Sequence, residues 1–180
     1  MTRARPYLAM SMIILLCGVT LTTVAHADVA LGGPRCFGLD ATIIGTPGDD
    51  VLVGTDGDDV VVSLGGNDEI GTLDGRDTVC AGRGDDVVNL GPGLFGDDFS
   101  RARGGGGDDE LNGDVGFDAL WGGPGDDRLF AGEHHDVLRG GNGDDHLDGG
   151  EGDNGGFGGR HRVGDTCVNI LFPEGCEFTP

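Results

Sequence analysis

Residues 104–148 read as five consecutive nonamers: Gly104-Gly-Gly-Gly-Asp-Asp-Glu-Leu-Asn, Gly113-Asp-Val-Gly-Phe-Asp-Ala-Leu-Trp, Gly122-Gly-Pro-Gly-Asp-Asp-Arg-Leu-Phe, Ala131-Gly-Glu-His-His-Asp-Val-Leu-Arg and Gly140-Gly-Asn-Gly-Asp-Asp-His-Leu-Asp. In every nonamer the sixth residue is Asp and the eighth is Leu, and in four of the five the fourth is Gly. Composition alone does not keep three residue types in phase. The stretch therefore predicts a repeat architecture in which each nonamer is one structural unit.

The chemistry of the nonamer favours calcium. Glycines at the first, second and fourth positions allow positive φ and a tight turn, so that several carbonyl oxygens can face one point. The Asp at the sixth position adds a carboxylate to that point. Hard oxygen ligands suit Ca²⁺, whereas Zn²⁺ prefers nitrogen and sulfur. The apolar eighth residue, on a short strand, points toward a core, and a unit this small needs stacked neighbours to bury it.

The pattern resembles the RTX, or hemolysin-type, calcium-binding nonapeptide Gly-Gly-x-Gly-x-Asp-x-U-x, in which U is large and apolar. The resemblance implies an all-β fold, a parallel β-roll (β-solenoid) in which two nonamers form one coil of eighteen residues. It also implies that several Ca²⁺ ions lie between turns of successive coils on the same side. Each ligand Asp would then act with the Asp of the repeat after next.

A first block of the same repeat occupies residues 45–89, where the fourth, sixth and eighth positions remain Gly, Asp and an apolar residue. Its first and second positions depart from glycine at Thr46, Thr55, Ser63, Leu64, Thr72 and Leu73. The sixth position of both blocks gives ten candidate Ca²⁺ ligands: Asp50, Asp59, Asp68, Asp77, Asp86, Asp109, Asp118, Asp127, Asp136 and Asp145.

Three stretches interrupt the pattern. Residues 90–103 equal one nonamer plus five, so a repeat with a five-residue insertion would preserve the phase, with Asp98 as a further candidate ligand. His134 replaces the fourth-position Gly beside His135; the His-Glu-x-x-His spacing of a zinc protease is absent, and we interpret His134 as a tolerated substitution. Residues 149–157 carry Asn154 and Gly156 at the sixth and eighth positions and are expected to be a decayed terminal repeat.

The eighth positions predict a narrow core. Burying ten aliphatic side chains does not by itself offset the entropy of ordering about 100 residues. We therefore expect a chain largely unfolded without Ca²⁺ and folded with it. The predicted inward residues are Leu52, Val61, Ile70, Val79, Val88, Leu111, Leu120, Leu129, Leu138 and Leu147.

Four cysteines follow the N-terminal segment: Cys36, Cys80, Cys167 and Cys176. An even count in an exported chain indicates two disulfides, for which three connectivities exist. The short Cys167–Cys176 loop favours the pairing that leaves Cys36 with Cys80, and the ninth-position Cys80 should point outward toward an N-terminal partner. A zinc site is disfavoured, because no Cys or His cluster has ligand spacing.

The flanking segments predict export and two caps. Residues 1–27 have a basic start, an apolar middle and an Ala25-His26-Ala27 cleavage site, as in a secretory signal peptide; a membrane anchor or a lipoprotein through Cys17 fits less well. Residues 28–44 are expected to cap the first coil, and residues 158–180 to form a disulfide-stapled C-terminal cap. The β-roll would span residues 45–157, and the protein would be extracellular.

The charge excludes one class of function and leaves others open. Removal of residues 1–27 changes the net charge from −21 to −23, and such an acidic chain is no nucleic-acid binder. No Ser-His-Asp or Cys-His arrangement is discernible, and the aspartates recur too regularly for a glycosidase pair, so we expect no enzyme. The sequence favours a secreted, monomeric calcium-binding protein. The alternative functions are a surface adhesion or structural module and an accessory module of a toxin or enzyme. The protein or surface partner is not predictable from the residues.

Overall fold

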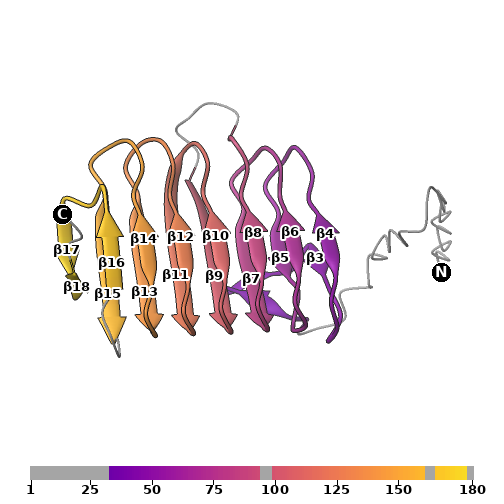
Figure 1. Cartoon of the computed structure of the whole chain (residues 1–180). Coiled ribbons are helices and arrows are strands. Elements are labelled where there is room, and N and C mark those ends of the chain that lie inside the picture. Colours follow the sequence, from indigo (N-terminus) through magenta and orange to yellow (C-terminus); the bar gives the residue numbers. More distant parts are fainter. Residues whose placement is uncertain (1–32, 94–98, 161–164, 178–180) are drawn as a thin grey trace, which may run out of the picture.

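The computed structural model describes residues 33–93, 99–160 and 165–177, and in these ranges the chain forms strands and turns without a helix (Figure 1). Two parallel eight-stranded sheets face each other. Sheet 1 contains β3 (Ile43–Ile44), β5 (Val60–Val62), β7 (Thr78–Arg83), β9 (Phe99–Gly106), β11 (Phe117–Pro124), β13 (Val137–Asn142), β15 (Gly155–Arg160) and β17 (Phe172–Glu174). Sheet 2 contains β4 (Val51–Val53), β6 (Glu69–Gly71), β8 (Val87–Asn89), β10 (Glu110–Asn112), β12 (Arg128–Phe130), β14 (His146–Asp148), β16 (Asp165–Val168) and β18 (Cys176–Glu177).

In the regular blocks, successive strands of each sheet are one coil of eighteen residues apart. Leu111 pairs with Leu129, and Leu129 pairs with Leu147, in parallel register. The chain therefore alternates between the two sheets, one nonamer to each strand, and the predicted parallel β-solenoid is confirmed. Across the irregular repeat Thr78 pairs with Arg101, an offset of 23 residues, which is five more than in a regular coil.

The core is the narrow space between the sheets. All ten predicted inward residues are buried, none exposing more than 3% of its surface. Ala102 continues the inward row of sheet 1 in the irregular repeat, and Cys167 continues that of sheet 2 in the C-terminal coil. At Gly156, where the row lacks a side chain, an added Cβ would touch Ile170, which packs against the core from the following segment.

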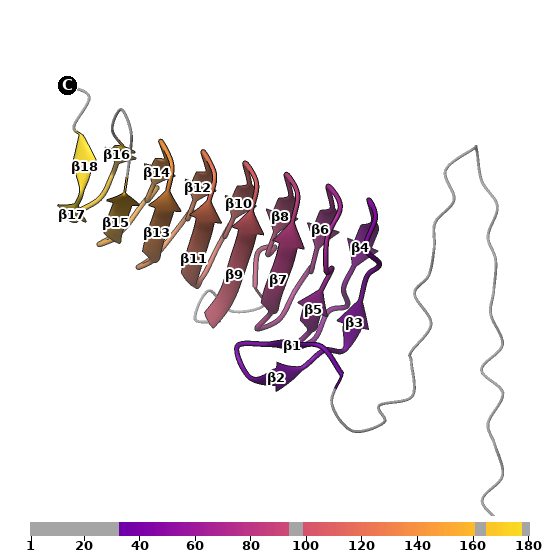
Figure 2. The same ribbon diagram turned by 90° about the horizontal axis from the view of Figure 1, so that it is seen from below.

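The N-terminal hairpin lies on the side of the roll. Its strands β1 (Arg35–Cys36) and β2 (Leu39–Asp40) are antiparallel, and β1 contacts β5 and β7 (Figure 2). The Cys36–Cys80 disulfide fixes it there, which confirms that predicted pairing. Ile43 and Ile44 belong to sheet 1 itself. The described part of segment 28–44 therefore does not cover the open end of the core as expected, because its apolar strand is used as the first rung of the sheet.

The sheets also continue beyond the predicted end of the roll at residue 157. Strand β16 pairs with β14, and β17 and β18 extend the two sheets by one further rung. This segment adds coils instead of closing the stack, because its backbone keeps the parallel ladder after the sequence pattern has decayed. Cys167 is disulfide-bonded. The side chain of Cys176 lies outside the described part of the structure, and the predicted Cys167–Cys176 pairing stays a prediction.

Two further predictions fall on residues outside the described ranges: the signal peptide at 1–27 and the candidate ligand Asp98. In the described ranges, no helix has the length and apolar character needed to span a membrane.

Candidate metal centres

The sixth-position side chains form two buried rows, one along each side of the roll where the turns enter the strands. In each row the Oδ1 atom accepts a hydrogen bond from the backbone N–H of the equivalent residue one coil earlier. Asp109 N–H donates to Asp127 Oδ1 at 2.9 Å, and Asp127 N–H donates to Asp145 Oδ1 at 2.9 Å. The row beside sheet 2 is Asp50, Asp68, Asp86, Asp109, Asp127, Asp145 and Asp165, and the row beside sheet 1 is Asp59, Asp77, Ser100, Asp118, Asp136 and Asn154.

All ten predicted ligand residues lie in these rows, and the structure adds two members that the sequence analysis missed. Ser100 replaces Asp in the irregular repeat, where its Oγ accepts the Asp77 N–H at 3.0 Å. Asp165 continues the other row, with Oδ1 accepting the Asp145 N–H at 3.0 Å. Counting back four residues from Gly104 identifies Ser100, and the Asp165-x-Cys167 spacing repeats the Asp-x-apolar signal. Asn154 keeps the amide contact of the Asp that it replaces.

The second carboxylate oxygen of most row members has no partner. Buried polar atoms in proteins almost always find a hydrogen bond, and an unpaired buried carboxylate is costly. Here the unpaired atoms are regularly spaced along the rows, which marks them as one structural feature. Among the described residues they are the Oδ2 atoms of Asp68, Asp77, Asp86, Asp109, Asp118, Asp127, Asp136, Asp145 and Asp165.

Glycine at the first position makes room for this oxygen. A Cβ added to Gly104, Gly122 or Gly140 would overlap with the Oδ2 atom of the Asp five residues later in the same repeat. At these three repeats the first-position glycine leaves the space that the carboxylate occupies, whereas Ser63, Thr72, Ala81 and Ala131 hold the same position in other repeats. In the three glycine repeats the first-position Gly and the sixth-position Asp together form a small space, called the cradle below, around the Oδ2 atom of the Asp.

Burial raises the pKa of these carboxyl groups. Desolvation is the largest cause throughout, and it raises the pKa of Asp118 to about 8, with the neighbouring Asp136 charge adding to it. Burial raises the pKa of Asp109 and Asp145 to about 7 against the opposing effect of the amide hydrogen bonds. The same effect brings the pKa to about 6 at Asp77, Asp86, Asp127 and Asp136. Uncompensated negative charge along the rows is thus unfavourable at neutral pH.

The first coil satisfies its carboxylates differently. Thr46 donates to Asp50 Oδ2 through both its N–H (2.6 Å) and its Oγ1 (3.0 Å). Thr55 makes the same two bonds to Asp59 Oδ2, at 2.7 and 2.9 Å. The Asp50 and Asp59 carboxylates therefore already have donors.

In the second coil, hydroxyl groups lie beside the carboxylates as in the first coil, but they donate their protons elsewhere. The hydroxyls of Ser63 and Thr72 lie beside Asp68 and Asp77 and lower their pKa somewhat, although burial still raises it overall. Each hydroxyl has one proton and donates it to a backbone carbonyl, that of Ala81 or Leu90. The Oδ2 atoms of Asp68 and Asp77 therefore still lack a donor.

The turn that contains His134 keeps the backbone of its neighbours. His134 has φ of 92°, the left-handed conformation that glycine adopts at this position in other coils. Its N–H donates to the Glu151 carbonyl at 2.8 Å, as Gly125 N–H donates to Asn142. His135 accepts the Asp153 N–H on Nδ1 at 2.9 Å. The substitution therefore leaves the turn geometry intact, as the tolerated-substitution interpretation requires.

The donor set fits Ca²⁺ better than a transition metal. No three His, Cys, Asp or Glu side chains converge on one point in the described part of the chain, the region of His134 and His135 included. A cation at the free Oδ2 atoms would have to complete its shell with backbone carbonyls or water. Ca²⁺ accepts such mixed oxygen shells of six to eight ligands, whereas Zn²⁺ requires about four nitrogen or sulfur donors.

Comparison with known proteins agrees with this geometry. The family model described as "RTX calcium-binding nonapeptide repeat (4 copies)" matches residues 38–70, 56–88, 72–99, 103–133 and 130–160. These overlapping segments cover both regular blocks and most of the irregular repeat. The comparison found no similar curated protein and no similar solved structure.

Proposed function

The chain belongs to the RTX calcium-binding nonapeptide repeat family, and on that premise we propose that it is a secreted protein that binds several Ca²⁺ ions and folds on binding them. The ions would lie along the two rows of sixth-position side chains, between turns of successive coils. The role of the metal is structural, since it supplies positive charge where the fold buries carboxylates.

One observation carries this proposal: the repeated, buried Oδ2 atoms without a hydrogen-bond partner. A divalent cation in each cradle would provide the missing interaction and reduce the repulsion between stacked carboxylates. Nothing else in the described chain offers these atoms a partner. We assign the ion-binding role to the nine aspartates that carry them: Asp68, Asp77, Asp86, Asp109, Asp118, Asp127, Asp136, Asp145 and Asp165.

Asp50 and Asp59 are a separate group within the predicted ligands. Their carboxylates accept two hydrogen bonds each from Thr46 and Thr55, so they need no cation to offset burial. We propose that the first coil closes without Ca²⁺ and that the metal-dependent part of the roll begins with Asp68. The number of bound ions is then set by the coils after the first.

Export and the absence of catalysis are parts of the same proposal. The Cys36–Cys80 disulfide supports an oxidising destination, and the signal-like segment 1–27 supports secretion. The repeated carboxylates serve the stack as a whole, because each has the same partner in the next coil. We therefore propose a binding or scaffolding role without catalysis, performed as a monomer.

The test is a calcium titration of the oxidised, signal-free protein followed by far-UV circular dichroism, with Mg²⁺ as the control ion. Mg²⁺ requires a smaller, near-octahedral shell and loses its water reluctantly. A cooperative gain of β signal with Ca²⁺ and none with Mg²⁺ at the same concentration is expected. An unchanged spectrum, or an equal response to both ions, would contradict calcium-dependent folding.

A further inference from the structure

A second feature of the molecule lies on the outer surface of sheet 1, away from the carboxylate rows. The ninth position of successive repeats on this face places alternating cationic and aromatic side chains on neighbouring strands β9, β11, β13 and β15. They border an open groove, which includes connected hollows of about 340 and 420 Å³. The four residues, in order along the roll, are Arg103, Trp121, Arg139 and Phe157.

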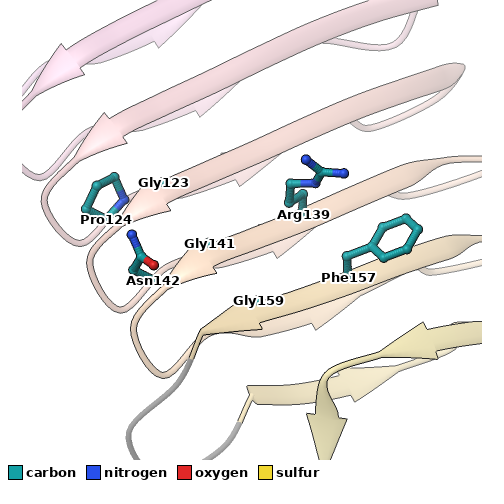
Figure 3. Close-up of a pocket in the computed structure, with 7 residues that line it drawn as sticks. All are labelled: Gly123, Pro124, Arg139, Gly141, Asn142, Phe157 and Gly159. Atoms are coloured by element: carbon teal, nitrogen blue, oxygen red, sulfur yellow. The ribbon is translucent and has the colours of Figure 1, made fainter.

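Figure 3 shows the construction of the groove at its C-terminal end. Arg139 and Phe157 stand along one side, and Pro124 and Asn142 stand on the other. Between them the floor is made by second-position glycines such as Gly141. The repeat therefore produces a channel with a bare backbone floor that runs across the strands, parallel to the axis of the roll.

The arginines of this face are not paired with carboxylates, although the chain carries 32 acidic residues and 11 arginines. The ion pairs among the described residues are Arg35–Asp40 and Arg76–Asp58, both elsewhere. The guanidinium carbon of Arg139 lies 5.5 Å from the Phe157 ring centroid, and that of Arg103 lies 5.1 Å from Phe37. Stacking on aromatic rings thus orients these cations and leaves their hydrogen-bond donors available.

The N-terminal hairpin contacts the residues at the β9 end of the groove. Phe37 lies 5.0 Å from Trp121, between ring centroids, and also under Arg101 at 4.8 Å. The neighbouring Cys36 holds it there through the disulfide to Cys80. Phe37 itself has φ of 48°, a conformation that a residue other than glycine adopts rarely, so its position is fixed by the surrounding structure.

We propose that this groove binds a linear acidic polysaccharide that lies along the axis of the roll. Neighbouring strands are about 4.8 Å apart, so Arg103 and Arg139 recur at about 10 Å, as do Trp121 and Phe157. A pyranose ring in an extended chain advances by roughly one such strand spacing. Alternate rings would stack on the two aromatic side chains, and acidic groups would bond the two arginines.

Three properties of the groove favour this ligand over a peptide or nucleic acid. Its floor consists of inner strands whose backbone groups are already paired, so an added peptide strand would find no ladder to extend. A nucleic acid needs a broad basic surface, whereas this groove offers a single line of arginines, Arg103 and Arg139, two strands apart. A neutral glycan would leave the unpaired arginines without acceptors.

The experiment uses a galacturonate hexamer added to the oxidised protein at a fixed free Ca²⁺ concentration. Trp121 is the only tryptophan of the chain, so its fluorescence reports occupancy of the groove directly. We expect saturable binding with a change in emission, and much weaker binding of the methyl-esterified, neutral hexamer. A heparin hexasaccharide distinguishes sulfate from carboxylate as the acidic group; preferred binding of either supports the proposal.

Matched variants separate the groove from general electrostatics, with calorimetry as the measurement. Arg139→Ala should weaken binding by about tenfold or more, whereas Arg128→Ala, the same change on the outer face of sheet 2, should have less than about a twofold effect. Trp121→Ala should weaken it as well, unlike Phe130→Ala on β12. Equal loss in Arg139→Ala and Arg128→Ala, or equal binding of a glutamate hexapeptide, would overturn the proposal.

This inference requires the folded roll and not a particular ion, so its failure is distinct from failure of the calcium proposal. Circular dichroism of each variant under the titration conditions shows whether the roll is folded. A folded protein that binds neither acidic hexamer would remove the polysaccharide site and leave the calcium function standing. A roll that folds without Ca²⁺ and binds the hexamer would remove calcium-dependent folding and leave the polysaccharide site standing.

Discussion

The first coil and the block at residues 104–148 have the same backbone but satisfy their aspartates in different ways. In the first coil, Thr46 and Thr55 donate to the carboxylates of Asp50 and Asp59. In the later block glycine occupies the equivalent second position at four of the five repeats, and every sixth-position Oδ2 atom lacks a donor. We infer that a threonine hydroxyl and a bound cation are alternative partners for the Oδ2 atom of a buried aspartate.

The position of the first coil in the stack explains why it can use threonine. In later coils a Cβ on a second-position glycine would collide with a carbonyl oxygen of the coil before it, as at Gly141 against Gly123. No such coil precedes Thr46 and Thr55. The hydroxyl solution is therefore available at the start of the roll. In the later coils the second position holds glycine, or Leu64, Leu73 or Asp114 with positive φ, and none of these side chains donates to the carboxylate, which is left dependent on a metal.

The disulfide adds to this difference. Cys36 and Cys80 are 44 residues apart in sequence, and closing a loop of that length stabilises the folded state by about 4 kcal/mol in the chain-entropy description. The closed loop contains the first two coils. We infer that residues 33–80 form the part of the roll that depends least on Ca²⁺, and that residues 104–148 depend on it most.

Removal of Ca²⁺ should give the largest effect and tests the comparison directly. With EDTA, backbone amides of β12 and β14 should lose hydrogen-exchange protection, because the carboxylates beside them are uncompensated. Amides of β5 should retain more of theirs, since hydroxyls and the disulfide remain. Hydrogen exchange followed by mass spectrometry measures both regions in one sample. Equal loss of protection in β5 and β12 would mean that the two regions respond to calcium as one unit.

Acid should partly replace calcium. The carboxyl groups of Asp109, Asp118 and Asp145 have folded-state pKa values near 7 to 8, above the ordinary value of 3.8. A raised folded pKa means that the folded state binds protons more tightly, so the stabilisation is complete below about pH 3.8 and is lost as the pH rises through about 7 to 8. Calcium-free protein should therefore show more β signal at pH 5 than at pH 8.

The pH experiment is a circular dichroism series in EDTA, with calcium-saturated protein as the control. Because protons and Ca²⁺ compete for the same oxygens, the calcium midpoint should move to higher concentration as the pH falls. A calcium-free protein that loses β signal between pH 8 and pH 5 would contradict the assignment of buried, uncompensated carboxylates.

Two glycines at the same repeat position should respond in opposite ways to alanine. Gly143 has φ of 144°, and an added Cβ would overlap with the Gly125 carbonyl oxygen, so Gly143→Ala should lower the free energy of unfolding by more than about 2 kcal/mol. Gly48, also at a fourth position, has open space and no positive φ. Gly48→Ala should leave stability unchanged or raise it by up to about 1 kcal/mol. Urea unfolding in Ca²⁺ measures both; similar losses would contradict the role of the preceding coil.

The two adjacent aspartates of one repeat test the assignment of the ligand. Asp127 is buried with a free Oδ2, whereas Asp126 is exposed and accepts the Asp144 N–H at 2.9 Å. Asp127→Ala should raise the calcium midpoint of folding by about tenfold, because it removes a charged ligand. Asp126→Ala should raise it by less than about threefold. Equal shifts in the two variants would show that the fifth position contributes as much as the sixth.

The phase of the nonamer was sufficient to predict the coil and the core. Leu129 and Leu147 are buried where the eighth position places them, and the 23-residue offset at Thr78 follows from the count of residues 90–103. These features depend on local periodicity, which each repeat carries in its own sequence. The pairing of Cys80 with Cys36 followed from the outward direction of the ninth position.

What the repeat pattern did not predict depends on neighbours outside the repeat. Ser100 and Asp165 lie after insertions, so their membership of the rows required the phase to be counted across irregular segments. The threonine donors of the first coil depend on which coil lies beneath. The location of the hairpin depends on aromatic contacts of Phe37 with residues far along the chain. The sequence of a single nonamer does not contain the residues that determine these contacts, so it cannot predict them.

The smallest effect, at Thr55, isolates the exchange between hydroxyl and metal. Thr55→Val keeps the shape of the side chain and removes the hydroxyl that donates to Asp59 Oδ2 at 2.9 Å, while the backbone donor at 2.7 Å remains. The change should lower the calcium-free stability by about 1 kcal/mol. It should cost less in saturating Ca²⁺, because a cation can then take the place of the hydroxyl at Asp59. Thr46→Val repeats the test at Asp50, and urea unfolding with and without Ca²⁺ measures both variants. An identical loss in the two conditions would mean that the hydroxyl and the cation are not interchangeable, and that the first coil is closed to metal whatever its side chains donate.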